Sequence, residues 1–275
     1  MIGPTESNEL FRLLDGLPLA ITQAAAYIQQ TGISFTRYTE FYKTQWKELM
    51  QSEGNMLQEY DNRSVWTTWT ISYHAVRSNN EAAANLLLLW SHLENKDLWF
   101  GLLATASKQN IVAANLISLQ LHEIGSNELK FNEAIRLLRN YSLIEEMEDL
   151  TAYTMHPVVH NWALHIQGEE QRVELAELAV MIVGLAVPHD LEKEYWILQR
   201  RLLSHAQCCS RWILGDAGGI PDQRASTQCE TDAEREEVEV LPLAIHEIGN
   251  LFVDQGKLVE AEQMYQHVLK GPRGY

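Results

Sequence analysis

The sequence has no hydrophobic run long enough to cross a membrane. Its longest apolar segment, from Leu178 to Val187, has ten residues and stops at Pro188, whereas a membrane-spanning helix needs about 20. Residues 1–15 also lack the basic stretch followed by an apolar core that marks a secretory signal. We therefore expect a soluble cytoplasmic protein that does not associate with membranes.

Cysteine is rare, and its spacing suits neither a disulfide framework nor a metal site. Cys208 and Cys209 are adjacent and Cys229 is distant, so no C-x-x-C pair exists. His156 and His160 have the spacing of zinc ligands, but the glutamate of HExxH and a third ligand are missing. These observations predict a reducing compartment and no bound metal.

Basic residues are also few. The chain has 21 lysine and arginine residues against 37 acidic ones, which gives a formal net charge of −16. Such a surface repels the phosphates of nucleic acids and the headgroups of anionic lipids. We expect neither nucleic acid nor a membrane among the partners.

The signatures of phosphate binding and of catalysis are missing as well. No GxxxxGK[ST] loop occurs, because the only Gly-Lys step, Gly256-Lys257, is followed by Leu258 and lacks the first glycine of the motif. No GxSxG elbow and no other triad signature occurs. We predict no catalytic residue and no enzymatic activity for this chain.

The residues that are present indicate a helical protein with more than one compact unit. Its 275 residues, 46% of them hydrophobic, can bury sizeable cores. At the N-terminus the pattern predicts a helix at Asn8–Asp15 that Gly16 closes, a second helix from Pro18 to about Gln30 that Gly32 ends, and a third that starts near Ser34 or Thr36.

A second group of elements follows the polar stretch Ser52–Asn62. The sequence predicts helices at Ser64–Val76, Glu81–Leu93 and Phe131–Tyr141, a two-stranded hairpin over Ser142–Glu146 and Thr151–Met155, and a helix from Pro157 to about Gln167. A hairpin after the third helix is the order of a winged helix, a variant of the helix-turn-helix.

The last part of the chain contains one candidate repeat. Two helices broken at Pro188–Asp190 precede a linker rich in Gly, Asp and Glu, and order returns at Leu241. Residues 242–272 then fit the tetratricopeptide pattern, whose small, large and aromatic positions are occupied by Ile248, Gly249, Phe252, Gly256, Ala261 and Tyr265. An ordinary helical hairpin is the alternative. Because a single repeat cannot bury its outer face, we expect a chain cut from a longer protein, or else packing on the preceding helices.

Four sets of residues, in this order, carry a resemblance to a known family. They are Leu14–Ile21 with Gln23–Tyr27, Ser64–Trp69 followed by Leu86–Leu89, Tyr153–His160, and Trp196 with Arg200–His205. These segments resemble the part of NB-ARC-type STAND NTPases that follows the nucleotide-binding core, where the first holds the GLPLA motif and the third the MHD-type motif. They are most similar to fungal NOD-like proteins that end in tetratricopeptide arrays, and the resemblance spans most of residues 8–270.

The resemblance implies a mainly α fold in five parts. They are a helical subdomain with the GLPLA motif (1–58), a winged-helix domain with a small β-hairpin and an MHD-like motif (59–168), a helical linker (169–214), an acidic flexible linker (215–240), and the truncated first repeat of a tetratricopeptide α-solenoid (241–275).

It also implies a nucleotide-controlled switch. In that family the GLPLA proline contacts the adenosine part of the nucleotide and the MHD histidine meets the β-phosphate of ADP, which implies these roles for Pro18 and His156. Pro157 replaces the aspartate of the motif, so the locking role of that aspartate does not carry over. ADP or ATP would bind only together with a nucleotide-binding core that this chain lacks.

The residues support His156 independently. If Pro157 is the first helical residue, His156 is the N-cap at the positive end of the helix dipole, where an anion is favoured. The alternatives are that His156 only caps the helix or bonds within the core, and that Pro18 only starts a helix.

We therefore expect a regulatory and scaffolding fragment of an ADP/ATP-switched NOD-like signalling protein. Its repeat would bind protein partners, and its full-length parent could oligomerise. A free-standing tetratricopeptide adaptor without nucleotide dependence and a winged-helix DNA-binding regulator are the alternatives. Charge disfavours DNA, because the hairpin carries Glu145, Glu146 and Glu148 against only Arg136 and Arg139 on the candidate recognition helix.

Overall fold

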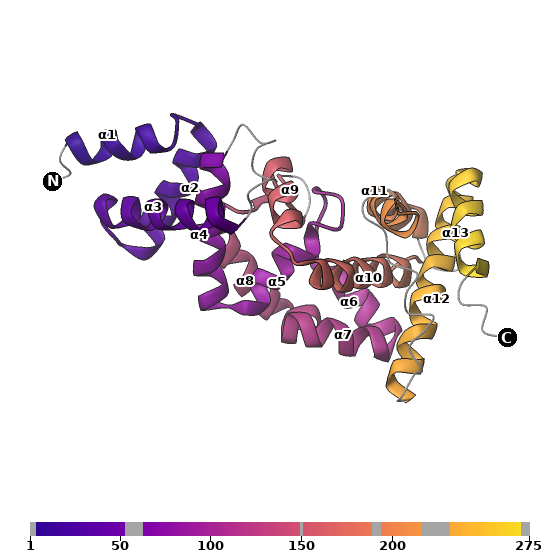
Figure 1. Ribbon diagram of the computed structural model, residues 1–275. Coiled ribbons are helices and arrows are strands. Elements are labelled where there is room, and N and C mark those ends of the chain that lie inside the picture. The colour runs from indigo at the N-terminus through magenta and orange to yellow at the C-terminus, as the bar shows by residue number, and fades with distance from the viewer. Residues whose placement is uncertain (1–3, 53–62, 149–150, 189–193, 216–231, 271–275) are drawn as a thin grey trace. The chain divides into compact units, whose positions relative to one another are not determined.

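The computed structural model describes residues 4–52, 63–148, 151–188, 194–215 and 232–270 (Figure 1). Over these residues the protein is mainly helical, with one small antiparallel sheet of two strands, as the sequence predicts. No helix in this part of the chain is long and apolar enough to cross a membrane. The chain divides into two compact units: unit 1 is Met1–Ala84 with Asn132–Glu145, and unit 2 is Asn85–Phe131 with Glu146–Tyr275.

Unit 1 is built on the N-terminal helices and has an aromatic core. The ring of Tyr27 lies 5.4 Å from that of Tyr38 and 5.9 Å from that of Tyr141, centroid to centroid. Gln23 is fully buried beside them, and its amide donates a hydrogen bond to the carbonyl of Ser142. The helices are α1 (Pro4–Leu13), α2 (Pro18–Thr31), α3 (Phe35–Ser52) and α4 (Arg63–Asn79), with the start of α5 (Glu81–Trp90) and most of α8 (Glu128–Asn140).

Unit 2 is organised around α10 (Glu169–Leu185). Every residue from Leu175 to Leu185 is buried, and all but Glu177 are apolar or glycine, as expected of a helix that lies in the core. A Cβ atom on Gly184 would lie 2.2 Å from the carbonyl oxygen of Ala244, so glycine is what allows the two backbones to approach here. The helices packed on α10 are α6 (Phe100–Gln109), α7 (Ile111–Leu121), α11 (Tyr195–Ile213) and α12 (Asp232–Asp254).

The hairpin follows α8, as expected. Strand β1 (Glu145–Glu146) pairs with β2 (Tyr153–Thr154), and α9 (Pro157–His165) comes next. The strands are shorter than predicted, and α9 ends two residues early. The short 3-10 helix η2 (His122–Gly125) connects α7 to α8.

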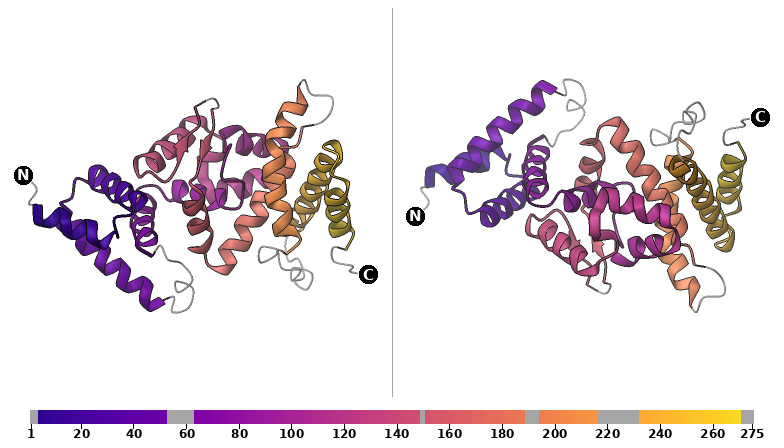
Figure 2. Two further views of the ribbon diagram at one scale, coloured as in Figure 1. Left: turned by 90° about the horizontal axis from the view of Figure 1, so that it is seen from above. Right: turned by 90° about the horizontal axis from the view of Figure 1, so that it is seen from below.

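The C-terminal segment forms the predicted helical hairpin. Helices α12 and α13 (Leu258–Lys270) run side by side (Figure 2), joined by a turn in which Gly256 has a φ of +71°. A Cβ atom on Gly249 would lie 2.6 Å from the ring of Tyr265, so glycine at this position allows the two helices to approach closely. The hairpin packs on the preceding helices: α12 contacts α10, and both α12 and α13 contact α11.

Helix α12 begins at Asp232, ahead of Leu241 where the sequence predicts that order returns. The composition of the preceding segment favours a linker there, whereas the observed helix continues through Pro242. A proline usually starts a helix, because inside one it removes a hydrogen bond at a cost of about 3 kcal/mol. Some predicted features lie wholly or partly outside the described residues: the polar stretch (53–62), the hairpin turn (149–150), the helix break (189–193), most of the linker (216–231, with Cys229) and the end of the repeat (271–275).

Candidate functional site

Pro18 lies in unit 1, at the start of α2. Asp15 and Gly16 both have positive φ values, +52° and +66°, and turn the chain between α1 and α2. Leu17 is the extended N-cap and Pro18 is the first helical residue, as the sequence predicts. The Pro18 side chain is exposed, so its ring is available for contact.

His156 lies in unit 2, at the start of α9. It is the N-cap of the helix, and its Nδ1 accepts a hydrogen bond from the N–H of Val158 at 3.3 Å. The predicted capping position is therefore confirmed. Because Nδ1 is the acceptor, the proton of the neutral ring sits on Nε2. The side chain is exposed, and Nε2 has no partner among the residues that the structure describes.

Pro18 and His156 belong to different units, so the structure places each of them only within its own unit. Each residue has the local position that the sequence predicts: Pro18 is the first residue of α2 and His156 is the N-cap of α9. Their common contact with a nucleotide stays a prediction.

The segment that leads to His156 is held by the loop that connects α5 to α6. Residues 153–155 pair with this loop: Leu98 and Tyr153 exchange both of their backbone hydrogen bonds, at 3.0 and 2.7 Å, and the N–H of Met155 donates to the carbonyl of Asn95 at 2.8 Å. The Asn95 amide donates back to the carbonyl of Met155 at 2.7 Å. The sequence contains no strand signal for the loop, which is why this pairing was not predicted.

Side chains of α11 bind the same loop, residues 94–99. The Arg201 guanidinium forms a two-pronged ion pair with the carboxylate of Asp97, at 2.9 Å from Nε and 2.5 Å from the terminal nitrogen. It also lies 4.0 Å from the ring centroid of Trp99. His205 accepts from the N–H of Glu94 through Nδ1 at 3.2 Å and donates to the carbonyl of Asp97 through Nε2 at 3.0 Å.

Two further histidines, the buried His92 and the partly buried His160, lie around the same region of unit 2. His92 Nε2 is 2.8 Å from Oε1 of Gln167, and His160 Nε2 donates to the carbonyl of Leu93 at 2.9 Å. Burial lowers the pKa of His92 to about 4, and burial likewise lowers the pKa values of His160 and His205. These rings are therefore neutral at neutral pH and act as structural hydrogen-bonding groups.

The weak metal signals in the sequence are explained by these contacts. His160 is hydrogen-bonded to a backbone carbonyl and His205 to the 94–99 loop. The Cys208 thiol is hydrogen-bonded to Arg211 and Glu94. No group of three or more His, Cys, Asp or Glu side chains in the described part of the chain could hold a metal ion.

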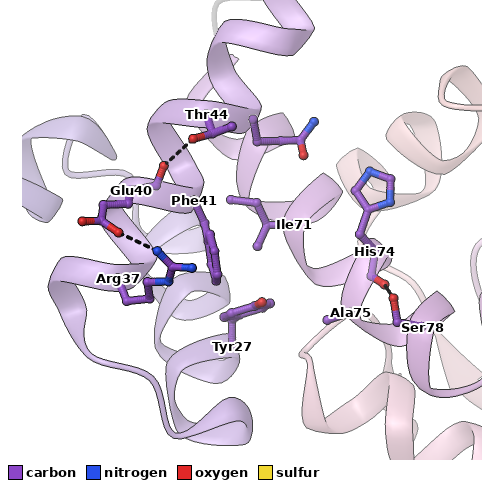
Figure 3. Close-up of a pocket in the computed structure, with 10 residues that line it drawn as sticks. Tyr27, Arg37, Glu40, Phe41, Thr44, Ile71, His74, Ala75 and Ser78 are labelled. Atoms are coloured by element: carbon purple, nitrogen blue, oxygen red, sulfur yellow. Dashed lines mark hydrogen bonds and ion pairs between the residues drawn. The ribbon is translucent and has the colours of Figure 1, made fainter.

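A cavity of about 560 Å³ opens in unit 1, away from the predicted residues. Tyr27, Phe41 and Ile71 line it, with the exposed His74 on its wall (Figure 3). Arg37 covers one side, 4.6 Å from the Phe41 ring centroid and 2.9 Å from the carboxylate of Glu40. Neither Pro18 nor His156 is among its lining residues.

The charges on the candidate recognition helix and the hairpin are as expected. Arg136 and Arg139 are exposed on α8, and Glu145, Glu146 and Glu148 are exposed on the hairpin. A phosphate backbone that approached this hairpin would meet three carboxylates.

Comparison with known proteins gives one distant relative. No protein-family model and no solved structure matches the chain. A nucleotide-binding leucine-rich repeat (NLR)-like protein of Hyaloscypha variabilis is 29% identical over 176 residues, which cover 60% of this chain and 16% of that protein. The chain thus spans a small part of the relative's length. The similarity supports a relationship to NLR-type proteins.

Proposed function

We propose that this chain is the regulatory and scaffolding region of a NOD-like signalling protein that senses whether ADP or ATP is bound. The similarity to an NLR-like protein supports this class of protein. Because the sequence has no GxxxxGK[ST] loop, the proposal assigns the phosphate-binding loop and the Mg²⁺ ligands to a core outside these residues. The chain alone binds no nucleotide tightly and hydrolyses none.

The observation that carries the proposal is the setting of His156. It caps α9, its side chain is exposed, and its Nε2–H is unused by the described residues. The positive end of a helix and an imidazole donor together favour an anion. In the proposal this anion is the β-phosphate of ADP. Acceptance of the Val158 N–H by Nδ1 fixes the tautomer that presents the donor.

The remaining parts take the roles that the family resemblance implies. Pro18, exposed at the start of α2, contacts the adenosine part of the nucleotide. Helix α8, the hairpin and α9 form the winged helix, and α12 with α13 forms the first tetratricopeptide repeat. Its exposed apolar side chains Leu258, Val259 and Leu269 offer a surface to protein partners.

The first experiment is to read the transcript upstream of Met1. An in-frame P-loop and Walker B stretch would support the switch. A transcript that begins just before Met1 and encodes neither motif would instead support a free-standing adaptor.

The second experiment measures ADP affinity on the protein that includes the core. His156→Ala should weaken ADP binding by about ten- to a hundredfold, because a hydrogen bond to a charged group contributes about 1.5–3 kcal/mol. His246→Ala, an exposed histidine of α12, serves as the matched control. Equal ADP affinity in wild type and His156→Ala would sink the sensor role. Phosphate release above blank from the pure 275-residue chain would contradict the absence of ATPase activity.

A further inference from the structure

Helix α11 has two faces, each of which holds a different part of unit 2. Arg201 and His205, one helical turn apart, form hydrogen bonds to the 94–99 loop. Gln199 is two positions from Arg201 and therefore points to the opposite side of the helix. On that side α11 packs beside α12 and α13 (Figures 1 and 2).

The Gln199 face fixes the turn between α12 and α13. The side chain of Gln199 is buried. Its amide nitrogen donates to a carboxylate oxygen of Asp254 at 2.7 Å, and its oxygen accepts from the side-chain amide of Gln255 at 3.2 Å. A buried amide that uses both its donor and its acceptor on one turn specifies the position of that turn closely.

The Arg201 face fixes the loop that pairs with residues 153–155. Asp97 has a φ of +55°, a conformation that persists in a non-glycine residue when its surroundings hold it there. The Arg201 ion pair holds the Asp97 side chain and His205 holds its carbonyl. Charge-assisted, two-pronged pairs of this kind are the strongest hydrogen bonds in proteins.

The loop then determines the position of His156. The backbone hydrogen bonds of Leu98 and Asn95 set the register of residues 153–155, and His156 is the next residue. Hydrogen bonds and the backbone of α11 therefore link the α12–α13 turn, through the loop, to Met155, the residue that precedes the cap of α9.

We propose that α11 couples the C-terminal helical hairpin to the position of His156. Arg201 and His205 are positioning residues that act through the 94–99 loop, and Gln199 connects the same helix to the hairpin. A partner that moves the hairpin would shift α11, loosen the loop and change how His156 meets an anion. The consequence for nucleotide sensing rests on the proposed function, whereas the mechanical coupling does not.

Amide hydrogen exchange on the full 275-residue chain tests the coupling without any nucleotide. Arg201→Met should speed exchange at the Tyr153 and Met155 amides about tenfold, because it frees the loop that protects them. Gln199→Ala should speed exchange both at the α12–α13 turn and at residues 153–155. The NMR signal of the His156 ring should shift or broaden in both variants, a change that general loosening of the core would not confine to this ring.

Matched variants keep the test decisive. Arg200→Met changes an exposed neighbour on the same helix and should leave residues 153–155 at wild-type exchange. If Arg201→Met loses protection in the buried helix α10, Asp97→Asn replaces it, because asparagine keeps the shape and tolerates the positive φ. Unchanged exchange at Tyr153 and Met155 in folded Arg201→Met or Asp97→Asn would overturn the positioning role.

A change confined to the α12–α13 turn in Gln199→Ala would overturn the coupling to the hairpin. A coupling that holds, combined with an ADP affinity that His156→Ala does not alter, would leave the mechanical inference standing and remove the proposed function.

Discussion

His92 should make the stability of unit 2 depend on pH in mildly acidic solution. Its ring is fully buried. The Gln167 side-chain nitrogen donates to Ala163 at 2.8 Å and to Ser91 at 2.9 Å, which leaves the Gln167 oxygen to accept from Nε2 of His92. The ring is thus held in one neutral tautomer, and its Nδ1 has no partner among the described residues.

The size of the effect follows from the pKa. Burial lowers the pKa of His92 to about 4, with smaller contributions from the nearby His160 and Arg172, whereas an unfolded histidine titrates near 6.5. Below pH 6.5 the unfolded state therefore binds a proton that the folded state refuses, and stability falls as the pH falls toward 4. Between pH 7.5 and pH 5 the loss from this one residue is about 2 kcal/mol.

The test compares the wild-type chain with His92→Gln in urea at pH 7.5 and pH 5. Glutamine keeps a donor for Gln167 but does not titrate, so the variant should lose about 2 kcal/mol less stability than the wild type over this range. Part of the loss of stability between pH 7.5 and pH 5 should remain in His92→Gln, because burial lowers the pKa values of His160 and His205 as well. His246→Gln, at an exposed position of unit 2, should leave the pH dependence as in the wild type.

Two results would refute this reasoning. The first is a His92 ring signal that titrates near pH 6.5 in an NMR titration of the folded chain. The second is a pH dependence of stability that His92→Gln leaves unchanged. Either would show that the ring keeps access to water in the folded protein.

Two other substitutions test the packing. Gly184→Ala should destabilise the chain by about 3 kcal/mol in urea unfolding, because the new methyl group would meet the backbone of Ala244. Gly168→Ala places its methyl group in open space and should cost less than about 1 kcal/mol. Equal losses of stability in the two variants would contradict the close packing at Gly184. Asn110→Ala should cost about 1 kcal/mol and lower the thermal midpoint, because the Asn110 side chain caps α7 by accepting from the N–H of Val112 at 2.8 Å; an unchanged midpoint would contradict the capping role.

Helix ends were the features most accessible from the sequence. Pro18 starts α2, Gly32 ends it with a φ of +70°, and His156 caps α9. Each of these depends on the conformational limits of one residue and its immediate neighbours. Pro242 does not follow these local preferences. It lies inside α12, a helix that packs on α10 and α13, so the local pattern alone does not locate the start of this helix.

The contacts around the 94–99 loop could not be predicted from the sequence. Arg201 and Asp97 are far apart along the chain, and neither lies in a motif. Likewise, nothing in the local pattern of Gly184 shows that its partner is the backbone of Ala244. Pairings of this kind depend on which helices meet, and many distant residues decide that together.

By itself, the amino-acid sequence determined the helical class of this protein, the starts of α2 and α9 and the local setting of Pro18 and His156, because these follow from short-range steric and hydrogen-bonding preferences. The tertiary structure alone decided that α10 is the buried centre of unit 2, that His92 and His205 are buried and neutral, and that α11 joins the C-terminal hairpin to the loop beside His156. Burial and long-range pairing are properties of the packed chain, since the same residue types occur at the surface and in the core.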